Sequence, residues 1–423
     1  MQDQDNSRRD FIKAAGVGGL GLVALSSPWL KVFGDNKANS KAASDKVRIG
    51  MIGVGSRGSY HLNYLKQMEQ TDNIEVIGVC DNYQPHLNDA INITKGTAKG
   101  YLDYRKLLEV KDLDGVVIAT PLHMHAQITI DALKAGKHVF CEKAMAKTIE
   151  ECKLMVDTAR EKGKILQIGH QRLFKPTYIK AIEYIRSGKL GKVTQIRAYW
   201  HRNNDWRRPL PSPELERQIN WRLYREYSCG LMTELASHHI QVANWVLGKT
   251  PVSVMGTGSI NYWKDGREVE DNIAVIYSYA DGTQFVYDSM TSNKFYGLEQ
   301  QILGDKGTME LETNKMYSEN PPQPAGILQL VNDIEHGIFD SITVAGASWV
   351  PETAAKNKGE MICLDDKIDE GKLQLIGLVN AIRQNKPVPQ LMEQGYYSGL
   401  WTLLGQQAID EKRIITLPKE YII

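Results

Sequence analysis

Hydrophobic and polar positions follow two successive rhythms along this 423-residue chain. In the first part, short continuous apolar runs are separated by segments with helical spacing. The runs occupy 47–52, 74–80, 113–119 and 138–141. Continuous apolar runs of this length are typical of strands buried on both faces, and their alternation with helices predicts a parallel sheet. We therefore expect residues 45–166 to form a doubly wound α/β domain.

From about Ile165 the rhythm changes to successive short strands with hairpin turns such as Asp281-Gly282 and almost no helix between them. The expected strands are 193–200, 252–260, 273–279, 283–290, 298–303 and 308–311. This pattern predicts a mostly antiparallel, open sheet. Helical spacing returns at 373–383 and 395–410, whereas 314–367 shows no clear period. Residues 167–423 are thus expected to form an α+β domain. As a separate hypothesis, we expect this domain to bind the substrate and its sheet to mediate homo-oligomerisation.

The N-terminal segment has a different character from the rest of the chain. Arg8-Arg9 precedes an uncharged, glycine-rich stretch at 14–25, and a polar linker rich in Lys, Ala, Asn and Ser follows. This order matches a twin-arginine export signal. We expect residues 1–44 to be signal and linker and the protein to be periplasmic or otherwise exported. No stable membrane insertion is expected after cleavage, with an uncleaved anchor as the alternative.

Charge and cysteine content narrow the possible partners. Lys plus Arg is 51 and Asp plus Glu is 50, so a net charge of +1 gives no reason to expect nucleic acid. The five cysteines show no paired spacing and are interpreted as buried thiols. His123 and His125 lack a third neighbouring ligand, so no metal site is expected.

A glycine-rich turn joins the first apolar run to the helix after it. Gly53, Gly55 and Gly58 form G-x-G-x-x-G, with Ser56 and Arg57 inside the turn. Such a turn lets a pyrophosphate approach the backbone at a helix N-terminus, as in Rossmann dinucleotide-binding folds. The second apolar run ends in Asp81, about 20 residues on, where a carboxylate binds the adenosine ribose hydroxyl. No arginine neighbours Asp81, which favours NAD over NADP, and Arg57 is the residue that leaves NADP open.

These features together resemble the glucose-fructose oxidoreductase and inositol dehydrogenase (Gfo/Idh/MocA) family from about Lys46 to the C-terminus. The resemblance is carried by the glycine turn, Asp81, Thr120-Pro121 with His125, Ala135 to Lys143, and Gly230 to Gly248. It implies cofactor-binding roles for Thr120, Pro121, His125, Glu142 and Lys143. In the family, proline usually follows the Glu-Lys pair, whereas this chain has Ala144.

The resemblance also implies an acid and a histidine four residues apart on a helix. Here they are Glu234 and His238, with His239 as the nearest rival. At i and i+4 the two side chains share one helical face, so the carboxylate is expected to orient the imidazole. His238 then accepts a proton, and Lys143, at the end of a predicted strand, hydrogen-bonds the reacting oxygen.

Several aromatic and polar residues are candidates for binding a sugar, because sugars place ring faces on aromatic side chains and hydroxyls on fixed polar groups. Most lie between Tyr199 and Pro209, after a predicted strand. The candidates are Trp200, Arg202, Trp206 and Arg207, with His170, Tyr178 and His239 added from outside this segment. The alternative for the segment is a solvated loop anchored by its tryptophans.

The sequence therefore predicts an NAD-dependent oxidoreductase that removes hydride from a hydroxyl-bearing ring carbon of a sugar, polyol or glycoside. Because an exported enzyme has no nicotinamide pool, its cofactor must be held tightly and recycled. One alternative is a redox-neutral, NAD-dependent glycoside hydrolase working by oxidation, elimination, hydration and reduction. A second is a non-catalytic nucleotide-binding module, against which the presence of both Lys143 and the histidine helix argues.

Overall fold

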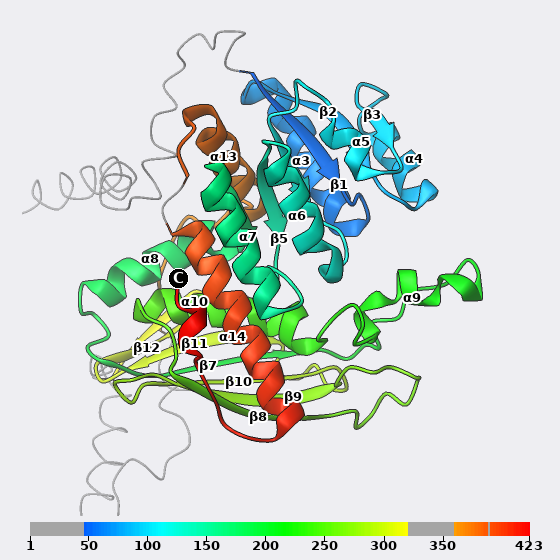
Figure 1. Ribbon diagram of the computed structural model, residues 1–423. Helices are drawn as coiled ribbons and strands as arrows, with labels where there is room; N and C mark the ends of the chain where they lie inside the picture. Colours follow the sequence, from blue (N-terminus) through cyan, green and yellow to red (C-terminus); the bar gives the residue numbers. More distant parts are fainter. Residues whose placement is uncertain (1–45, 320–358, 388–389) are drawn as a thin grey trace, which may run out of the picture.

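The computed structural model describes residues 46–319, 359–387 and 390–423. The predicted export signal and linker lie outside these residues, as does most of the aperiodic segment 314–367. Figure 1 shows a domain of parallel strands and helices above a broad second sheet, with helix α14 (Leu391–Glu411) beside both. None of the helices in the described ranges is both long and apolar enough to cross a membrane.

The N-terminal domain is a six-stranded parallel sheet in the order β3-β2-β1-β4-β5-β6. Its strands are β1 (Val47–Ile52), β2 (Ile74–Cys80), β3 (Lys99–Tyr101), β4 (Gly115–Ile118), β5 (His138–Glu142) and β6 (Leu166–Gly169). Strands β4 and β5 are buried along their whole length, which explains their continuous apolar runs. The order reverses at β1, so the carboxyl ends of β1 and β4 flank the crevice in which such sheets bind ligands.

Helices cover this sheet and connect its strands. They are α3 (Ser56–Thr71), α4 (Gln84–Ile93), α5 (Tyr104–Leu108), α6 (His125–Lys134) and α7 (Ile149–Lys162). The start of α7 is fixed by a capping box, because Thr148 accepts from the Glu151 amide while Glu151 accepts from the Thr148 amide. Gly163 ends the same helix in the left-handed conformation.

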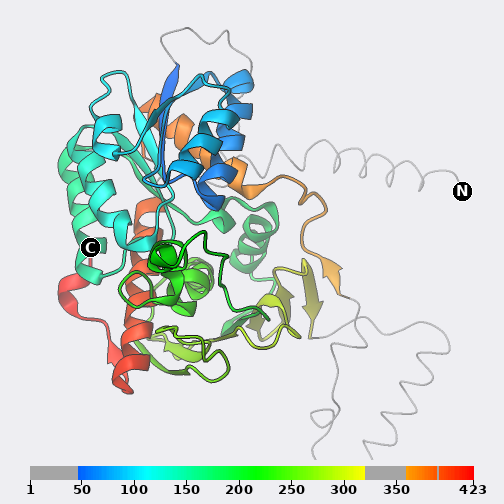
Figure 2. The same cartoon turned by 90° about the vertical axis from the view of Figure 1, so that its right-hand side faces the viewer.

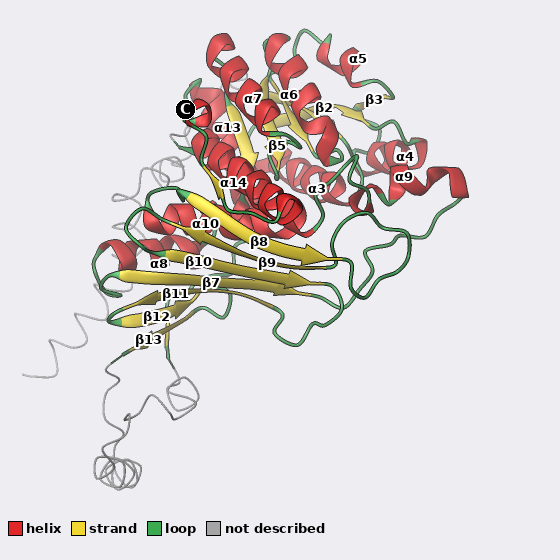
Figure 3. Ribbon diagram, turned by 60° about the horizontal axis from the view of Figure 1, so that its bottom comes forward, coloured by secondary structure: helices red, strands yellow, loops and turns green. Residues whose placement is uncertain are grey.

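The second sheet has nine strands in the order β14-β13-β12-β11-β7-β10-β9-β8-β15. They are β7 (Val193–His201), β8 (Ser253–Ser259), β9 (Asn272–Ser278), β10 (Gln284–Met290), β11 (Leu298–Gly304), β12 (Gly307–Glu310), β13 (Lys315–Ser318), β14 (Glu360–Met361) and β15 (Ile415–Thr416). Only the β7–β10 pair is parallel among these pairings, so the expected mostly antiparallel sheet is confirmed. Helices α8 (Pro176–Arg186), α10 (Ser237–Leu247) and α14 lie on the side toward the first domain (Figure 3).

Helix α14 packs against both sheets, because glycines let it approach closely. A Cβ at Gly395 would lie 2.3 Å from Ile168 of β6, and one at Gly405 would lie 2.4 Å from the hydroxyl of Tyr277 in β9. Larger side chains at these positions would push the helix off one sheet or the other. The two domains are therefore joined by a shared, tightly packed helix.

Late residues of the chain also return to the first domain, an arrangement not foreseen when 167–423 was assigned to the second. Helix α13 (Glu370–Gln384) packs on α3 and β1, and Figure 2 shows it beside the blue strands and helices. The Gln167 amide donates to the Gln374 carbonyl at 3.0 Å, and Arg383 donates to the Asp72 carbonyl at 2.6 Å.

Candidate active site

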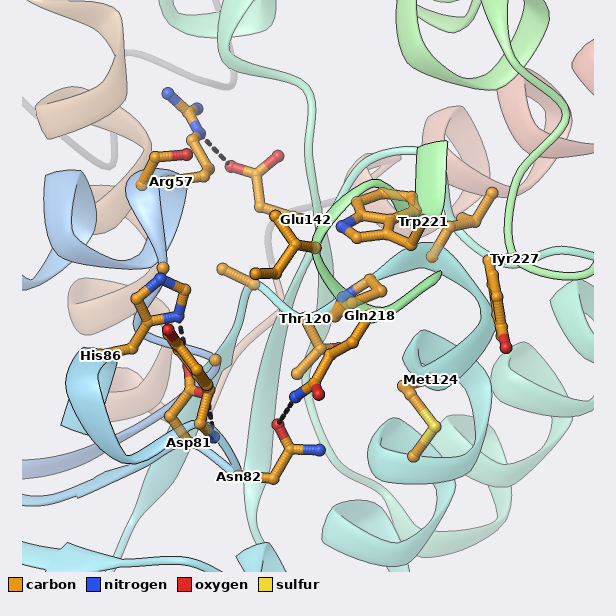
Figure 4. Close-up of a pocket in the computed structure, with 18 of the residues that line it drawn as sticks. Arg57, Asp81, Asn82, His86, Thr120, Met124, Glu142, Gln218, Trp221 and Tyr227 are labelled. Carbon is orange, nitrogen blue, oxygen red and sulfur yellow. Dashed lines mark hydrogen bonds and ion pairs between the residues drawn. The ribbon is translucent and has the colours of Figure 1, made fainter. Parts of the chain in front are cut away.

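A pocket of about 940 Å³ lies between the carboxyl edge of the parallel sheet and the segment that follows β7. One wall comes from the glycine turn, the ends of β2, β4 and β5, and the start of α6. The opposite wall comes from Arg208 to Tyr227 and from the turn carrying Glu234 and His238. Figure 4 shows side chains from both walls pointing into this space.

The glycine turn has the geometry that a dinucleotide requires. Gly53 has a positive φ of 82°, and a Cβ there would lie 2.7 Å from the Thr120 amide nitrogen. A Cβ at Gly58 would lie 1.9 Å from the Gly53 carbonyl oxygen, so helix and strand pack too closely for any side chain. At Gly55 a Cβ would meet only the His86 ring, at 3.3 Å, which leaves its pocket side open for a phosphate at the N-terminus of α3. The turn thus fits NAD.

Asp81, at the end of β2, lines the same pocket and is held by the backbone on both sides. Its carboxylate accepts from the Val54 amide at 2.9 Å and from the Tyr83 amide at 2.9 Å. His86 Nδ1 lies 3.6 Å away (Figure 4). The carboxylate is therefore fixed beside the glycine turn, where the adenosine ribose is expected.

Arg57 points away from Asp81. Its Nε donates to Glu142 at 2.7 Å (Figure 4). His61 Nε2 lies 2.6 Å from the same carboxylate oxygen. Although burial acts in the opposite direction, Arg57 and His61 hold the pKa of Glu142 well below its usual range. Because its guanidinium is engaged by Glu142, Arg57 is not placed to bind a ribose 2′-phosphate.

Lys143 follows directly after β5 and reaches across to the second domain. Its ammonium donates to the Glu234 carbonyl at 3.0 Å. Burial lowers the pKa of Lys143, while the nearby carboxylates of Glu234 and Glu142 oppose this shift. The ammonium therefore lies at the junction of the two domains with a charge partner on each side, and the predicted placement of Lys143 in the pocket is met.

The expected pairing of Glu234 with His238 is wrong. Glu234 lies in a π-helical turn (Met232–Ala236) that leads into α10, so the two side chains do not face each other as at i and i+4 of a regular α-helix. The Glu234 carboxylate instead accepts from Arg222 Nε at 2.8 Å. Burial raises the pKa of Glu234, but Arg222 and Lys143 outweigh it and leave the pKa below its usual value.

His238 lies 6% exposed on the pocket wall, and within the described ranges no protein hydrogen bond engages its ring. Burial, reinforced by the charges of Lys143 and Arg172, lowers its pKa well below the usual value and keeps the imidazole neutral. The Trp200 ring lies 5.7 Å away and the His170 ring 6.3 Å away, centroid to centroid. The unprotonated ring nitrogen, open to the pocket, can accept a hydrogen bond from a hydroxyl there, while the lowered pKa disfavours a stable imidazolium.

Two further predicted residues lie at the pocket, His125 among its lining residues and His170 buried outside that lining. The ring nitrogens of His125 lie 2.9 Å from the Ala144 carbonyl and 3.0 Å from the Thr120 carbonyl. A neutral His125 ring carries one N–H and donates to one of these two carbonyls, which follow the neighbouring strands β4 and β5. His170 is buried with neither ring nitrogen bonded, and burial lowers its pKa to about 3.

Tyr178 and His239 do not line the pocket, contrary to the predicted substrate contacts. Tyr178 is 1% exposed and its hydroxyl donates to Glu312 at 2.7 Å. His239 is fully buried, with Nδ1 3.0 Å from Gln300 Oε1 and 3.3 Å from an Arg172 nitrogen. These residues form a buried polar cluster between β11 and α10, so their part is in the packing of the second domain.

The four residues predicted to bind sugar around the end of β7 do not line the pocket. Trp200 packs beneath the Arg202 guanidinium at 5.0 Å, Trp206 packs on the core, and Arg207 pairs with Asp265 at 3.0 Å. The pocket is also lined by residues that no motif marks, and by two that were considered but not selected as site residues. The first are His86, Met124, Gln218, Trp221, Arg222 and Tyr227, and the second are His123 and Arg208. In the part of the chain that the structure describes, no group of three His, Cys, Asp or Glu residues is placed to hold a metal.

Comparison with known families gives matches to both domains. The model described as "Oxidoreductase family, NAD-binding Rossmann fold" of the Gfo/Idh/MocA group matches residues 47–170, and its C-terminal domain model matches residues 178–310. The chain belongs to the Gfo/Idh/MocA family. This match confirms the predicted family, the predicted fold and the predicted cofactor, NAD.

Curated relatives cover part of the chain. A glycosyl hydrolase family 109 protein from Shewanella baltica is 31% identical over 236 residues, covering 51% of this chain and 50% of that protein. An inositol 2-dehydrogenase from Salmonella paratyphi B is 26% identical over 273 residues, covering 63% and 74%. The chain thus matches about half the length of the Shewanella relative.

Solved structures extend the likeness to most of the fold. Levoglucosan dehydrogenase in complex with NADH and levoglucosan superposes with a TM-score of 0.67 at 19% identity, covering 88% of this chain and all of that chain. An aldose-aldose oxidoreductase from Caulobacter crescentus gives 0.67 at 20% identity, covering 88% and 100%. At these identities the likeness describes the fold.

Proposed function

We propose that this protein is an NAD-dependent oxidoreductase acting on a carbohydrate. The observation that carries the proposal is that Lys143 and His238, from different domains, line one pocket with the glycine turn and Asp81. A protein that only binds the nucleotide would need the glycine turn and Asp81 but neither Lys143 nor His238. Membership of an NAD-binding oxidoreductase family and relatives named inositol 2-dehydrogenase support the same function.

Different residues of the chain bind the cofactor, bind the reacting oxygen and accept the proton. The backbone of Gly53, Gly55 and Gly58, with Thr120 and Asp81, would hold NAD, which supplies the hydride acceptor when bound. The Lys143 ammonium binds the oxygen of the reacting hydroxyl and stabilises the negative charge that grows there. The neutral His238 imidazole takes the hydroxyl proton at a ring nitrogen.

The carbohydrate is accommodated by the wall of the second domain. The Trp221 and Tyr227 side chains line the pocket (Figure 4). The Arg222 guanidinium lies over the Trp221 ring at 4.2 Å. The Tyr227 and His123 rings lie 4.7 Å apart, centroid to centroid. Ring faces and fixed polar groups suit the alternating apolar faces and hydroxyls of a sugar. Trp221 then takes the stacking role that was predicted for Trp200 and Trp206.

A redox-neutral glycoside hydrolase is the second candidate, favoured by the 31% identity to a protein named for glycosyl hydrolase family 109. In this reaction, oxidation at one ring carbon acidifies the neighbouring C–H bond. The aglycone is then eliminated, water adds, and the hydride returns. The same Lys143 and His238 serve the first and last steps.

Export and assembly remain part of the proposal. Arg8-Arg9 and the uncharged stretch after them support twin-arginine export to the periplasm, with residues 1–44 as signal and linker. An exported enzyme of this kind keeps and recycles its NAD. The broad second sheet is proposed as the surface for homo-oligomerisation.

The two candidates are separated by one assay on a panel of glycosides. Purified protein is incubated with each glycoside in deuterated water without added cofactor. A glycoside hydrolase gives cleaved product carrying deuterium beside the oxidised carbon, with no net NADH. An oxidoreductase gives NADH up to one equivalent with the glycosidic bond intact. Cleaved product without deuterium and without any need for bound NAD would contradict both.

A further inference from the structure

The segment 205–222 crosses from the second domain to the nucleotide-binding edge of the first. It follows β7 and carries the short helix α9 (Glu216–Ile219), which lies near α4 in Figures 1 and 3. Two contacts join it to the first domain. An Arg208 guanidinium nitrogen donates to Ser56 Oγ at 3.3 Å, and the Gln218 amide donates to Asn82 Oδ1 at 3.5 Å (Figure 4).

The first of these contacts lies at the expected phosphate position and the second beside the carboxylate that is expected to bind the adenosine ribose. Ser56 is the first residue of α3, directly after the open position at Gly55, where a phosphate binds. Asn82 directly follows Asp81, the ribose-binding carboxylate. The segment therefore spans the pocket mouth from the pyrophosphate position to the adenosine ribose position.

The segment is held in place by its own ionic and hydrogen-bonding partners, so Arg208 is presented by a fixed support. Arg267, 6% exposed, donates to the Asp205 carbonyl at 2.7 Å. Arg207 Nε donates to Asp265 at 3.0 Å. The Arg208 amide donates to Asn220 Oδ1 at 2.8 Å, and the Asn220 side chain returns a bond to the Arg208 carbonyl at 3.3 Å.

The Arg208 guanidinium differs from its neighbours in its charge partners. Arg207 pairs with Asp265 and Glu216, Arg217 with Glu226 and Glu268, and Arg222 with Glu234. Among the described residues no carboxylate pairs with Arg208, and its recorded side-chain partner is the neutral Ser56 hydroxyl. An arginine that has no carboxylate partner, placed at the N-terminus of a helix that binds phosphate, favours the binding of an anion there.

We propose that Arg208 is a cofactor-binding residue contributed by the second domain. It binds the pyrophosphate of NAD across the pocket mouth, while Gln218 and Asn82 close the adenosine side. NAD is then enclosed by both domains and leaves only when these contacts break. This inference rests on the nucleotide site and not on the identity of the sugar, so a protein inactive on every carbohydrate would still test it.

The first test compares nucleotide fragments by calorimetry on nucleotide-free full chain. Arg208→Ala should weaken ADP at least about tenfold and leave adenosine within about twofold, because only ADP carries the pyrophosphate. The ADP affinity of Arg208→Lys should lie between those of Arg208→Ala and the unaltered protein. Arg186→Ala, which removes an exposed arginine from the last turn of α8, is the matched control and should change neither affinity. Equal weakening of ADP and adenosine, or unchanged ADP affinity, overturns the proposal.

The second test measures exchange of bound NAD against labelled NAD. Arg208→Ala should speed release about tenfold or more, and Gln218→Ala should speed it severalfold. A melting temperature within a few degrees of the unaltered protein shows that the variants fold. Release at the unaltered rate in a folded Arg208→Ala variant overturns the proposal.

Discussion

Glu234 and Arg222 form an ion pair at 2.8 Å on the pocket wall, and the same glutamate offers its backbone carbonyl to the Lys143 ammonium at 3.0 Å. Its carboxylate also favours the charged form of Lys143. The acid on the histidine helix therefore acts on the lysine, from the far side of the domain boundary. It does not orient His238.

This relationship predicts a shift in the alkaline limit of activity for Glu234→Gln. Removing the carboxylate removes a charge that raises the pKa of Lys143, so that pKa falls further below its ordinary value. If protonated Lys143 is required, kcat/KM should be lost at lower pH in Glu234→Gln than in the unaltered protein. The pH profile of kcat/KM is the measurement. An unmoved alkaline limb with reduced activity throughout would show that Glu234 does not act through Lys143.

Cofactor preference should depend on Asp81. Because Arg57 is engaged by Glu142 and Asp81 places a negative charge beside the ribose, NAD should bind at least about tenfold more tightly than NADP. Asp81→Ala should erode this preference. Asp81→Asn is the control, since its amide oxygen can still accept from the Val54 amide while the negative charge is gone. Equal calorimetric affinities for both nucleotides in the unaltered protein would contradict the ribose assignment.

Tyr178 and Tyr227 should respond oppositely to loss of the hydroxyl. Tyr178→Phe removes a buried bond to Glu312 and should cost about 1–2 kcal/mol of unfolding free energy without changing KM. Tyr227→Phe alters a pocket-lining residue and should change KM without changing stability. Denaturant unfolding and steady-state kinetics on both variants give the comparison. A raised KM in Tyr178→Phe alone would restore the role that the sequence suggested.

Buried His170 should make the fold acid-sensitive. Its pKa is lowered to about 3 by burial, whereas in the unfolded chain it stays near 6.5. Below about pH 6.5 the unfolded state binds a proton that the folded state does not, so stability falls by up to about 1.4 kcal/mol per pH unit. This loss continues as the pH falls toward 3. In His170→Gln the free energy of unfolding should fall less steeply between about pH 7 and pH 5 than in the unaltered protein. Equal slopes of unfolding free energy against pH in the two proteins would show that His170 does not cause the acid sensitivity.

The strands with continuous apolar runs, the glycine turn and Asp81 were predictable because each depends on local sequence, whereas the short strands β3 and β6 were not predicted. Continuous apolar runs define buried strands, and the positions of Gly53 and Gly58 are fixed by contacts within one β–α unit. Lys143 was predictable in the same way, because its place at the end of β5 follows from the strand itself.

The opposite wall of the pocket was not predictable, because it is set by contacts between distant segments. Trp221 and Arg208 enter the pocket because Arg207, Asp265 and Asn220 hold the segment 205–222 over the first domain. Tyr178 and His239 were predicted to contact substrate, but both are buried, with polar partners in Glu312 and Gln300 respectively. The pairing of Glu234 failed because a π-helical turn changes which side chains face each other, and no local pattern marks that turn.

The most direct test of the central claim is a single-turnover experiment with enzyme-bound NAD. Unaltered protein, Lys143→Ala and His238→Ala, each shown to retain NAD, are mixed with cyclic polyols and sugars while NADH absorbance is followed. We predict that a carbohydrate reduces the bound NAD in the unaltered protein. Each variant should be slower by about a hundredfold or more. Reduction at equal rates in all three proteins would contradict the assignment of Lys143 and His238 to the reaction.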